Sequence, residues 1–161
     1  PDAAPSAPAR RGDALAPDGF QGPEATREAC VQLREQACLA TRHHWHPGDL
    51  MRTYLRDDAG MPALLAGNGA HANMSFILGV SNWAAATNLH MNPWVHLETS
   101  SQNFRAVKDN TFIVAEMSIA ELFEKKGHEF FDADVHLFNA EDDAGLCAIR
   151  LRAIYRHRQP G

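Results

Sequence analysis

Cysteine is scarce in this chain, and its three cysteines lie apart from one another. Cys30, Cys38 and Cys147 form no C-x-x-C pair, so the sequence offers neither a disulfide framework nor a zinc knuckle. An odd number of unpaired thiols favours a reducing compartment, and we expect a cytoplasmic protein. No uninterrupted apolar run reaches the roughly 18 residues of a transmembrane helix, which argues against a membrane partner.

A surplus of basic residues is also missing. The 161 residues include 15 Lys and Arg against 20 Asp and Glu, which gives a formal net charge of −5. Because a face that binds nucleic acid normally carries a basic excess, this balance argues against DNA or RNA as a partner. The length suits one domain with a single core.

The first 23 residues have no periodic apolar pattern and contain five of the nine prolines. This composition predicts a flexible leader over residues 1–23, followed by a single domain over 24–161. The chain also begins at Pro1 without a start Met. We expect either a piece of a longer protein or a natural tail or tag remnant.

The domain is expected to begin with a helix over residues 24–40 and to contain a longer helix over 70–88. The second stretch lacks proline and is apolar nearly all round, a pattern typical of a fully buried helix. Four alternating segments follow and predict antiparallel strands over 94–104, 111–123, 128–138 and 146–155. On the last two, Arg150 and Arg152 are expected to face Asp132 and Asp134 across a hairpin.

The densest histidine cluster lies between Thr41 and Asp49 and contains His43, His44 and His46. Imidazole is a common ligand of transition metals, but neighbouring histidines point apart in a regular element and the H-E-x-x-H pattern is absent. The sequence therefore predicts no metal site. We expect a solvated turn here, with a polar loop beside a functional site as the alternative.

A glycine turn at Gly67–Asn73 stands directly before the long apolar helix. Glycines allow a tight turn and a close approach to a ligand, and the free N–H groups of a helix's first turn attract an oxyanion or a polarised carbonyl. His71 is the candidate acid or base, since imidazole titrates near neutral pH. Asn73 and Asn68 are candidates for positioning a carbonyl or water. A backbone-satisfied histidine and a capping asparagine are the structural alternatives.

Four short segments resemble the MaoC-like hotdog proteins: residues 93–96, 104–107, 123–130 and 153–156. The similarity extends over roughly residues 49–158. It implies an α+β hotdog fold, in which an antiparallel sheet wraps around a long central helix. It also implies an acyl thioester of coenzyme A or acyl carrier protein as substrate, bound at a dimer interface, with no further cofactor.

By this analogy, the backbone around Gly69, Ala70 and His71 polarises the thioester carbonyl, and Asn68 joins Gly69 and Ala70 in binding substrate. His71 and Asn73 are the catalytic candidates. The chain departs from the family's hydratases, because it lacks their Gly-Asp-x-Asn-Pro-x-His stretch. It also has no carboxylate between Met74 and Leu89, where thioesterases of this fold usually place one.

Three functions follow from these residues. The leading expectation is a MaoC-like hydratase or dehydratase acting on acyl thioesters, with His71 as acid or base. The first alternative is an acyl-CoA thioesterase in which His71 activates a water. The second is a non-catalytic hotdog half that pairs with a catalytic partner. In each case we expect a homodimer or pairing with a second hotdog domain, since one such sheet leaves edges uncovered.

Overall fold

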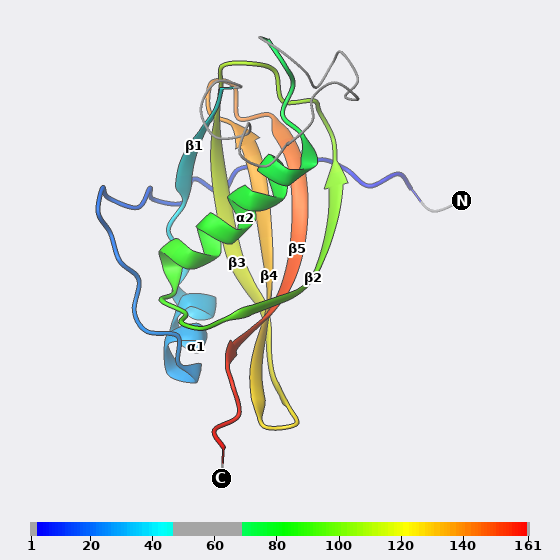
Figure 1. Ribbon diagram of the computed structural model, residues 1–161. Coiled ribbons are helices and arrows are strands. Elements are labelled where there is room, and N and C mark those ends of the chain that lie inside the picture. The colour runs from blue at the N-terminus through cyan, green and yellow to red at the C-terminus, as the bar shows by residue number, and fades with distance from the viewer. Residues whose placement is uncertain (1–2, 47–68, 161) are drawn as a thin grey trace.

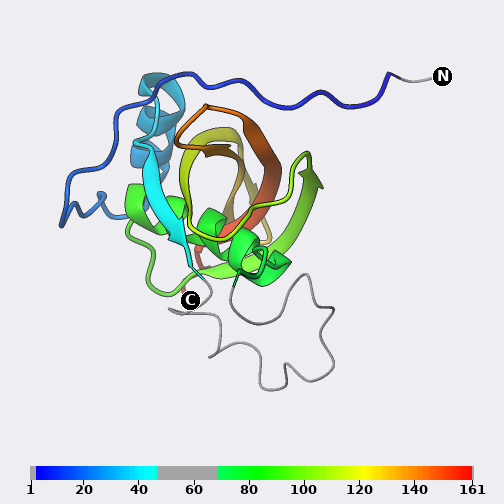
Figure 2. The same cartoon turned by 90° about the horizontal axis from the view of Figure 1, so that it is seen from above.

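The computed structural model describes residues 3–46 and 69–160, which form one curved sheet around a helix (Figure 1). Along the chain the elements are α1 (Arg27–Gln36), β1 (Thr41–Trp45), α2 (Met74–Asn88), β2 (Val95–Asn103), β3 (Thr111–Lys125), β4 (His128–Asn139) and β5 (Gly145–Arg156). The five strands pair antiparallel in the order β1-β3-β4-β5-β2. Seen from above, this sheet curls around α2 (Figure 2). The predicted α+β arrangement is confirmed.

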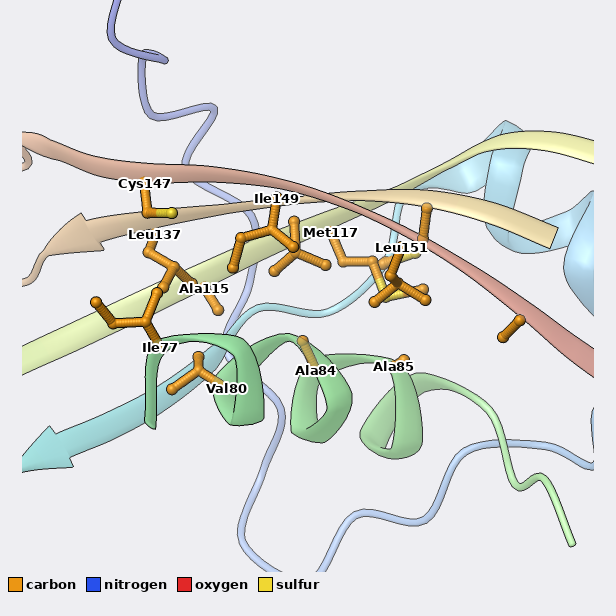
Figure 3. Packing of buried hydrophobic residues seen from close by; sticks show 14 of the residues in the cluster. Ile77, Val80, Ala84, Ala85, Ala115, Met117, Leu137, Cys147, Ile149 and Leu151 are labelled. Carbon is orange, nitrogen blue, oxygen red and sulfur yellow. The ribbon is translucent and has the colours of Figure 1, made fainter. Parts of the chain in front are cut away.

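The core fills the space between the concave face of the sheet and one side of α2 (Figure 3). Alternate residues of β3, β4 and β5 point inward, as their sequence period of two predicts, and meet small residues of α2. Fully buried examples are Ala84, Met117, Phe131, Leu137 and Leu151. Small side chains on α2 let the helix lie close to the sheet.

The long helix begins later than its apolar pattern predicts, because Asn73 caps it. The Asn73 side chain accepts a hydrogen bond from the Phe76 amide at 3.0 Å, so α2 starts at Met74. The prediction of a fully buried helix is wrong. The sheet covers only one side, and Trp83 on another side is 61% exposed.

The first helix is also shorter than predicted. Thr26 caps its start by accepting a hydrogen bond from the Ala29 amide at 3.1 Å, and Ala37 ends it with a φ of +78°. Cys30 and Cys38 are buried, as expected for ordinary thiols of a core.

Residues Thr41–Trp45 of the histidine-rich stretch form strand β1, so the prediction of a solvated turn is wrong for them. Residues 47–49 of that stretch lie outside the described residues. Thr41 and Trp45 are buried while Arg42 and His44 are exposed, which is the alternation of an edge strand. β1 pairs with the first five residues of β3, from Thr41 opposite Ala115 to Trp45 opposite Thr111.

The four later strands lie where the alternation predicts them. The turn between β3 and β4 contains only Lys126 and Gly127, with φ values of +55° and +81°. This left-handed pair matches the twist of a two-residue hairpin. The hairpin extends beyond the rest of the sheet (Figure 1).

The predicted ion pairs between β4 and β5 are confirmed. Arg150 donates to both carboxylate oxygens of Asp134 at 2.7 and 2.8 Å, and Arg152 donates to both oxygens of Asp132 at 2.8 Å. These bidentate pairs lie on the outer face of the sheet, because the residues between them in each strand point into the core.

The proline-rich leader runs along the outer face of the sheet, on the far side from α2 (Figure 2). Its anchor is the buried carboxylate of Glu116 on β3, which accepts hydrogen bonds from the amides of Arg11, Gly12 and Asp13 at 2.8, 2.9 and 2.7 Å. Further along, the Ala16 amide donates to the Ala40 carbonyl at 2.8 Å. The leader's flexibility and the boundary at residue 23 stay predictions.

Asn68, a predicted substrate-binding residue, lies outside the part of the chain that the structure describes, as does Gly67 at the start of the predicted glycine turn. In the described part, no helix is long and apolar enough to cross a bilayer.

Candidate active site

The turn before α2 is held at two backbone groups, one by β1 and one by the loop between β2 and β3. Trp45 donates its indole N–H to the Ala70 carbonyl at 2.8 Å, and the Ala72 amide donates to the Val107 carbonyl at 2.8 Å. Gly69, directly before Ala70, has a φ of +81°, a backbone conformation that residues with a side chain rarely adopt. The Ala70 carbonyl is therefore engaged within the protein and does not face a ligand.

The first turn of α2 contains amides that have no acceptor in the described part of the chain. The Phe76 amide donates to the Asn73 side chain, and the Ile77 amide donates to the Asn73 carbonyl at 3.2 Å. Among the described residues, none accepts a hydrogen bond from the amides of Met74 and Ser75. Free amides at the positive end of a helix dipole bind an oxyanion or a carbonyl oxygen.

The two residues predicted as catalytic lie at this helix start. His71 is half-buried, and its side chain has no hydrogen-bond partner in the described ranges. Asn73 uses its side-chain oxygen in the cap, which leaves the amide –NH₂ as its available group. Asn73 can therefore donate to a carbonyl oxygen, whereas its cap oxygen is already committed.

A polar strip that the sequence did not indicate lies beside this helix start. On β2, Thr99, Ser101 and Asn103 stand opposite the inward residues of β5 and so share the face toward α2. Ser101 and Asn103 are exposed, and Asn103 Nδ2 lies 3.1 Å from the Met74 sulfur. The strand's alternation predicts which residues share a face, but only the sheet order places this face beside the start of α2.

The three clustered histidines do not meet at one point. The rings of His44 and His46 stack with centroids 5.9 Å apart, whereas His43 lies beside Trp83 of α2. His43 Nε2 lies 2.7 Å from the Thr41 hydroxyl, and burial lowers the His43 pKa to about 4. His44 stacks on Phe112 with ring centroids 4.2 Å apart. His46 Nδ1 lies 3.4 Å from an Asp109 carboxylate oxygen. Within residues 3–46 and 69–160, no group of three or more His, Cys, Asp or Glu residues could hold a metal ion.

None of the three thiols is suited to nucleophilic chemistry. Burial raises the pKa of Cys30 to about 12 and those of Cys38 and Cys147 to about 11. Each cysteine is therefore a neutral thiol at physiological pH, and the thiolate is the nucleophilic form.

No protein-family model matches this chain, and no curated protein sequence matches it. Solved structures do. The chain is similar to a "putative thioesterase" from Pseudomonas putida KT2440, with 13% identity, a TM-score of 0.50, and coverage of 74% of this chain and 75% of that one. Two others are a "probable thioesterase" from Bartonella henselae, at 10% identity and TM-score 0.49, covering 77% and 100%, and a 1,4-dihydroxy-2-naphthoyl-CoA thioesterase from Synechocystis, at 11% and 0.48, covering 75% and 88%.

Proposed function

We propose that this chain, whose antiparallel sheet wraps around a central helix in the hotdog fold, is an acyl-CoA or acyl-carrier-protein thioesterase. Its proposed active site lies at the start of α2. The observation that carries this proposal is a pair of amides, those of Met74 and Ser75, that have no acceptor among the described residues. They stand in the same short stretch as His71 and Asn73. Hydrogen-bond donors for a carbonyl oxygen and a candidate base are thus brought together.

In the proposed reaction, the thioester carbonyl oxygen accepts hydrogen bonds from the Met74 and Ser75 amides and from Asn73 Nδ2. His71 takes a proton from water as the water oxygen attacks the carbonyl carbon. The amides stabilise the negative charge that develops on the oxygen. Collapse of the intermediate breaks the carbon–sulfur bond, and the leaving thiolate receives the proton from His71. The products are a carboxylic acid and a free thiol.

We favour hydrolysis, although the sequence analysis puts hydration first. The chain resembles MaoC-like proteins but lacks the Asp and His pair of their hydratases, and no described carboxylate is hydrogen-bonded to His71. The Pseudomonas putida protein of the same fold is described as a "putative thioesterase", which also supports hydrolysis. Water attack on the carbonyl carbon needs only one base and an oxyanion site.

The proposed substrate carries its acyl group on coenzyme A or on an acyl carrier protein, and we propose no other cofactor. We also propose that two chains pair, as a homodimer or with a second hotdog domain. Among the described residues β2 pairs only with β5, so its other edge is free, and Val95 and Leu97 on it are 39% and 49% exposed. Free apolar strand edges are commonly covered by a partner.

The test is a thioester assay with a panel of acyl-CoA and enoyl-CoA substrates, in which thiol release and enoyl absorbance are followed together. We expect thiol release by the wild type and a loss of at least about 100-fold in His71→Ala. His90→Ala removes an exposed histidine beyond the other end of α2 and serves as the matched control.

Other outcomes overturn the proposal in distinct ways. A change in enoyl absorbance without thiol would identify a hydratase. If a folded protein neither released thiol nor changed the enoyl absorbance, the non-catalytic hotdog half would be the remaining function. Equal activity of His71→Ala and the wild type would remove His71 from the mechanism.

A further inference from the structure

We infer that Trp45 is a positioning residue for the proposed oxyanion site, an inference that rests on the proposed thioesterase function. Trp45 is the last residue of β1 and is 2% exposed. Its indole N–H donates to the Ala70 carbonyl at 2.8 Å, across 25 residues of sequence. This contact joins the sheet to the turn that carries His71.

The same side chain also contacts the first turn of α2. The rings of Trp45 and Phe76 lie with centroids 4.8 Å apart at an interplanar angle of 54°. Phe76 is the residue whose amide Asn73 caps. One indole thus touches both the backbone just before His71 and the helical turn that bears the free amides of Met74 and Ser75.

Peptide geometry explains why the indole N–H affects His71. The Ala70 carbonyl and the His71 amide belong to one planar peptide group, in which C=O and N–H point in opposite directions. When Trp45 holds the carbonyl, it also fixes the direction of the His71 N–H and the position of the His71 Cα, from which the side chain extends. Loss of this hydrogen bond lets the peptide plane rotate, while ring packing on Phe76 still holds the helix.

Packing and positioning make different predictions for the Trp45 side chain. Ring packing alone requires a large apolar ring, and an indole supplies one whether or not its N–H is engaged. Positioning requires the N–H itself, since indole nitrogen is only a donor and the Ala70 carbonyl is its acceptor. A substitution that keeps the ring and removes the N–H separates the two roles.

The decisive variant carries 3-benzothienylalanine at position 45 alone, which replaces the indole N–H by sulfur and keeps the bicyclic shape. Trp45→Phe is the genetically simple companion. Tyr155→Phe is the matched control, because it removes a polar group from another buried ring, 5% exposed, on β5. Thermal unfolding is measured for each protein alongside kcat and KM for acyl-CoA hydrolysis.

We expect the benzothienyl variant to lose about 10-fold to 100-fold in kcat, because small misplacement of reacting groups has effects of this size. KM should change by less than about 3-fold, and the pH dependence of kcat should shift as the surroundings of His71 change. The Tyr155→Phe control should keep the wild-type kcat.

Two results would overturn the inference. An active wild type with unchanged kcat in the benzothienyl variant would show that Trp45 only packs, and would leave the thioesterase proposal intact. A folded wild type that releases no thiol would remove the proposed function, and the inference with it.

Discussion

At the scale of single residues, Asn88 joins the end of α2 to the chain between α1 and β1. It is 1% exposed, and its side chain pairs with both backbone groups of Leu39, accepting from the amide at 2.8 Å and donating to the carbonyl at 2.9 Å. A second donation reaches the Ala84 carbonyl at 3.0 Å. Every polar atom of this buried amide therefore has a partner.

We predict that Asn88→Leu lowers the free energy of unfolding by about 2–4 kcal/mol, because it leaves the half-buried Leu39 amide and carbonyl without partners. Urea denaturation monitored by circular dichroism measures the change. Thr87→Ala, at the neighbouring helical position, is the control and should change stability by less than about 1 kcal/mol. Equal effects of the two substitutions would contradict the role of Asn88.

His43 gives the fold a pH dependence whose sign is fixed. Burial lowers its pKa from 6.5 to about 4 in the folded protein, so the unfolded chain binds this proton at a higher pH. The contribution of neutral His43 is therefore complete above about pH 6.5 and is lost as the pH falls toward 4. Its size is about 1–2 kcal/mol, since the ring keeps some solvent contact.

We predict that His43→Gln loses less stability than the wild type between about pH 7 and pH 4.5, because its side chain does not titrate. Urea denaturation of both proteins at the two pH values gives the difference. Parallel losses in wild type and variant would show that other groups carry the acid sensitivity.

At the scale of elements, the leader is attached through backbone amides. Three of them donate hydrogen bonds to the Glu116 carboxylate. The Arg10 side chain adds two contacts: its guanidinium lies over the Phe138 ring, and it forms a 3.0 Å ion pair with Asp143. Burial alone raises the Glu116 pKa, but the hydrogen bonds from Arg11 and Asp13 and the nearby guanidinium groups outweigh it, so the pKa is lowered. The ionised carboxylate is the form that holds the leader.

We predict that Glu116→Gln speeds tryptic cleavage after Arg10 and Arg11 and lowers the free energy of unfolding by about 1.5–3 kcal/mol, the range for hydrogen bonds to charged groups. Glu121→Gln, at an exposed position of the same strand, is the control. In the wild type this contribution is present above the unfolded-state pKa and is lost as the pH falls through the lowered folded-state value. Cleavage at the wild-type rate in Glu116→Gln would contradict the anchor.

The sequence predicted elements best where side chains alternate. β2, β3, β4 and β5 lie within one or two residues of their predicted bounds, and the Arg150–Asp134 pair lies where the register predicts it. β1 was missed because its exposed positions are His and Arg, although Thr41 and Trp45 frame an alternation. Both helix starts were misplaced because the caps, Thr26 and Asn73, override the apolar pattern.

Contacts to backbone groups were beyond the reach of the sequence. The leader's anchor consists of amides, which every residue except proline carries, so no side-chain pattern reveals it. The hydrogen bond of Trp45 is equally unpredictable from the sequence, because its partner is a backbone carbonyl 25 residues away. The candidate stretch around His71 was found from the glycine turn and the helix that follows, both local features of the sequence.

At the scale of the whole molecule, the free edge of β2 is the surface we expect a second chain to cover. We predict that the wild type sediments at twice the monomer mass and that Leu97→Lys shifts it toward the monomer, because a charge in place of an apolar edge residue disfavours pairing. Phe20→Lys changes another exposed apolar residue, 39% exposed and in the leader, and should leave the dimer intact. A monomeric wild type would contradict this prediction.

The three buried thiols have a practical consequence for labelling. With raised pKa values and exposures of 0–2%, Cys30, Cys38 and Cys147 should not react with maleimides in the folded protein. A cysteine introduced at exposed Glu124, near the tip of the β3–β4 hairpin, would then carry a single dye without any change to the native cysteines. Fluorescence from that one position would then test, in real time, whether the proposed acyl-carrier-protein substrate binds.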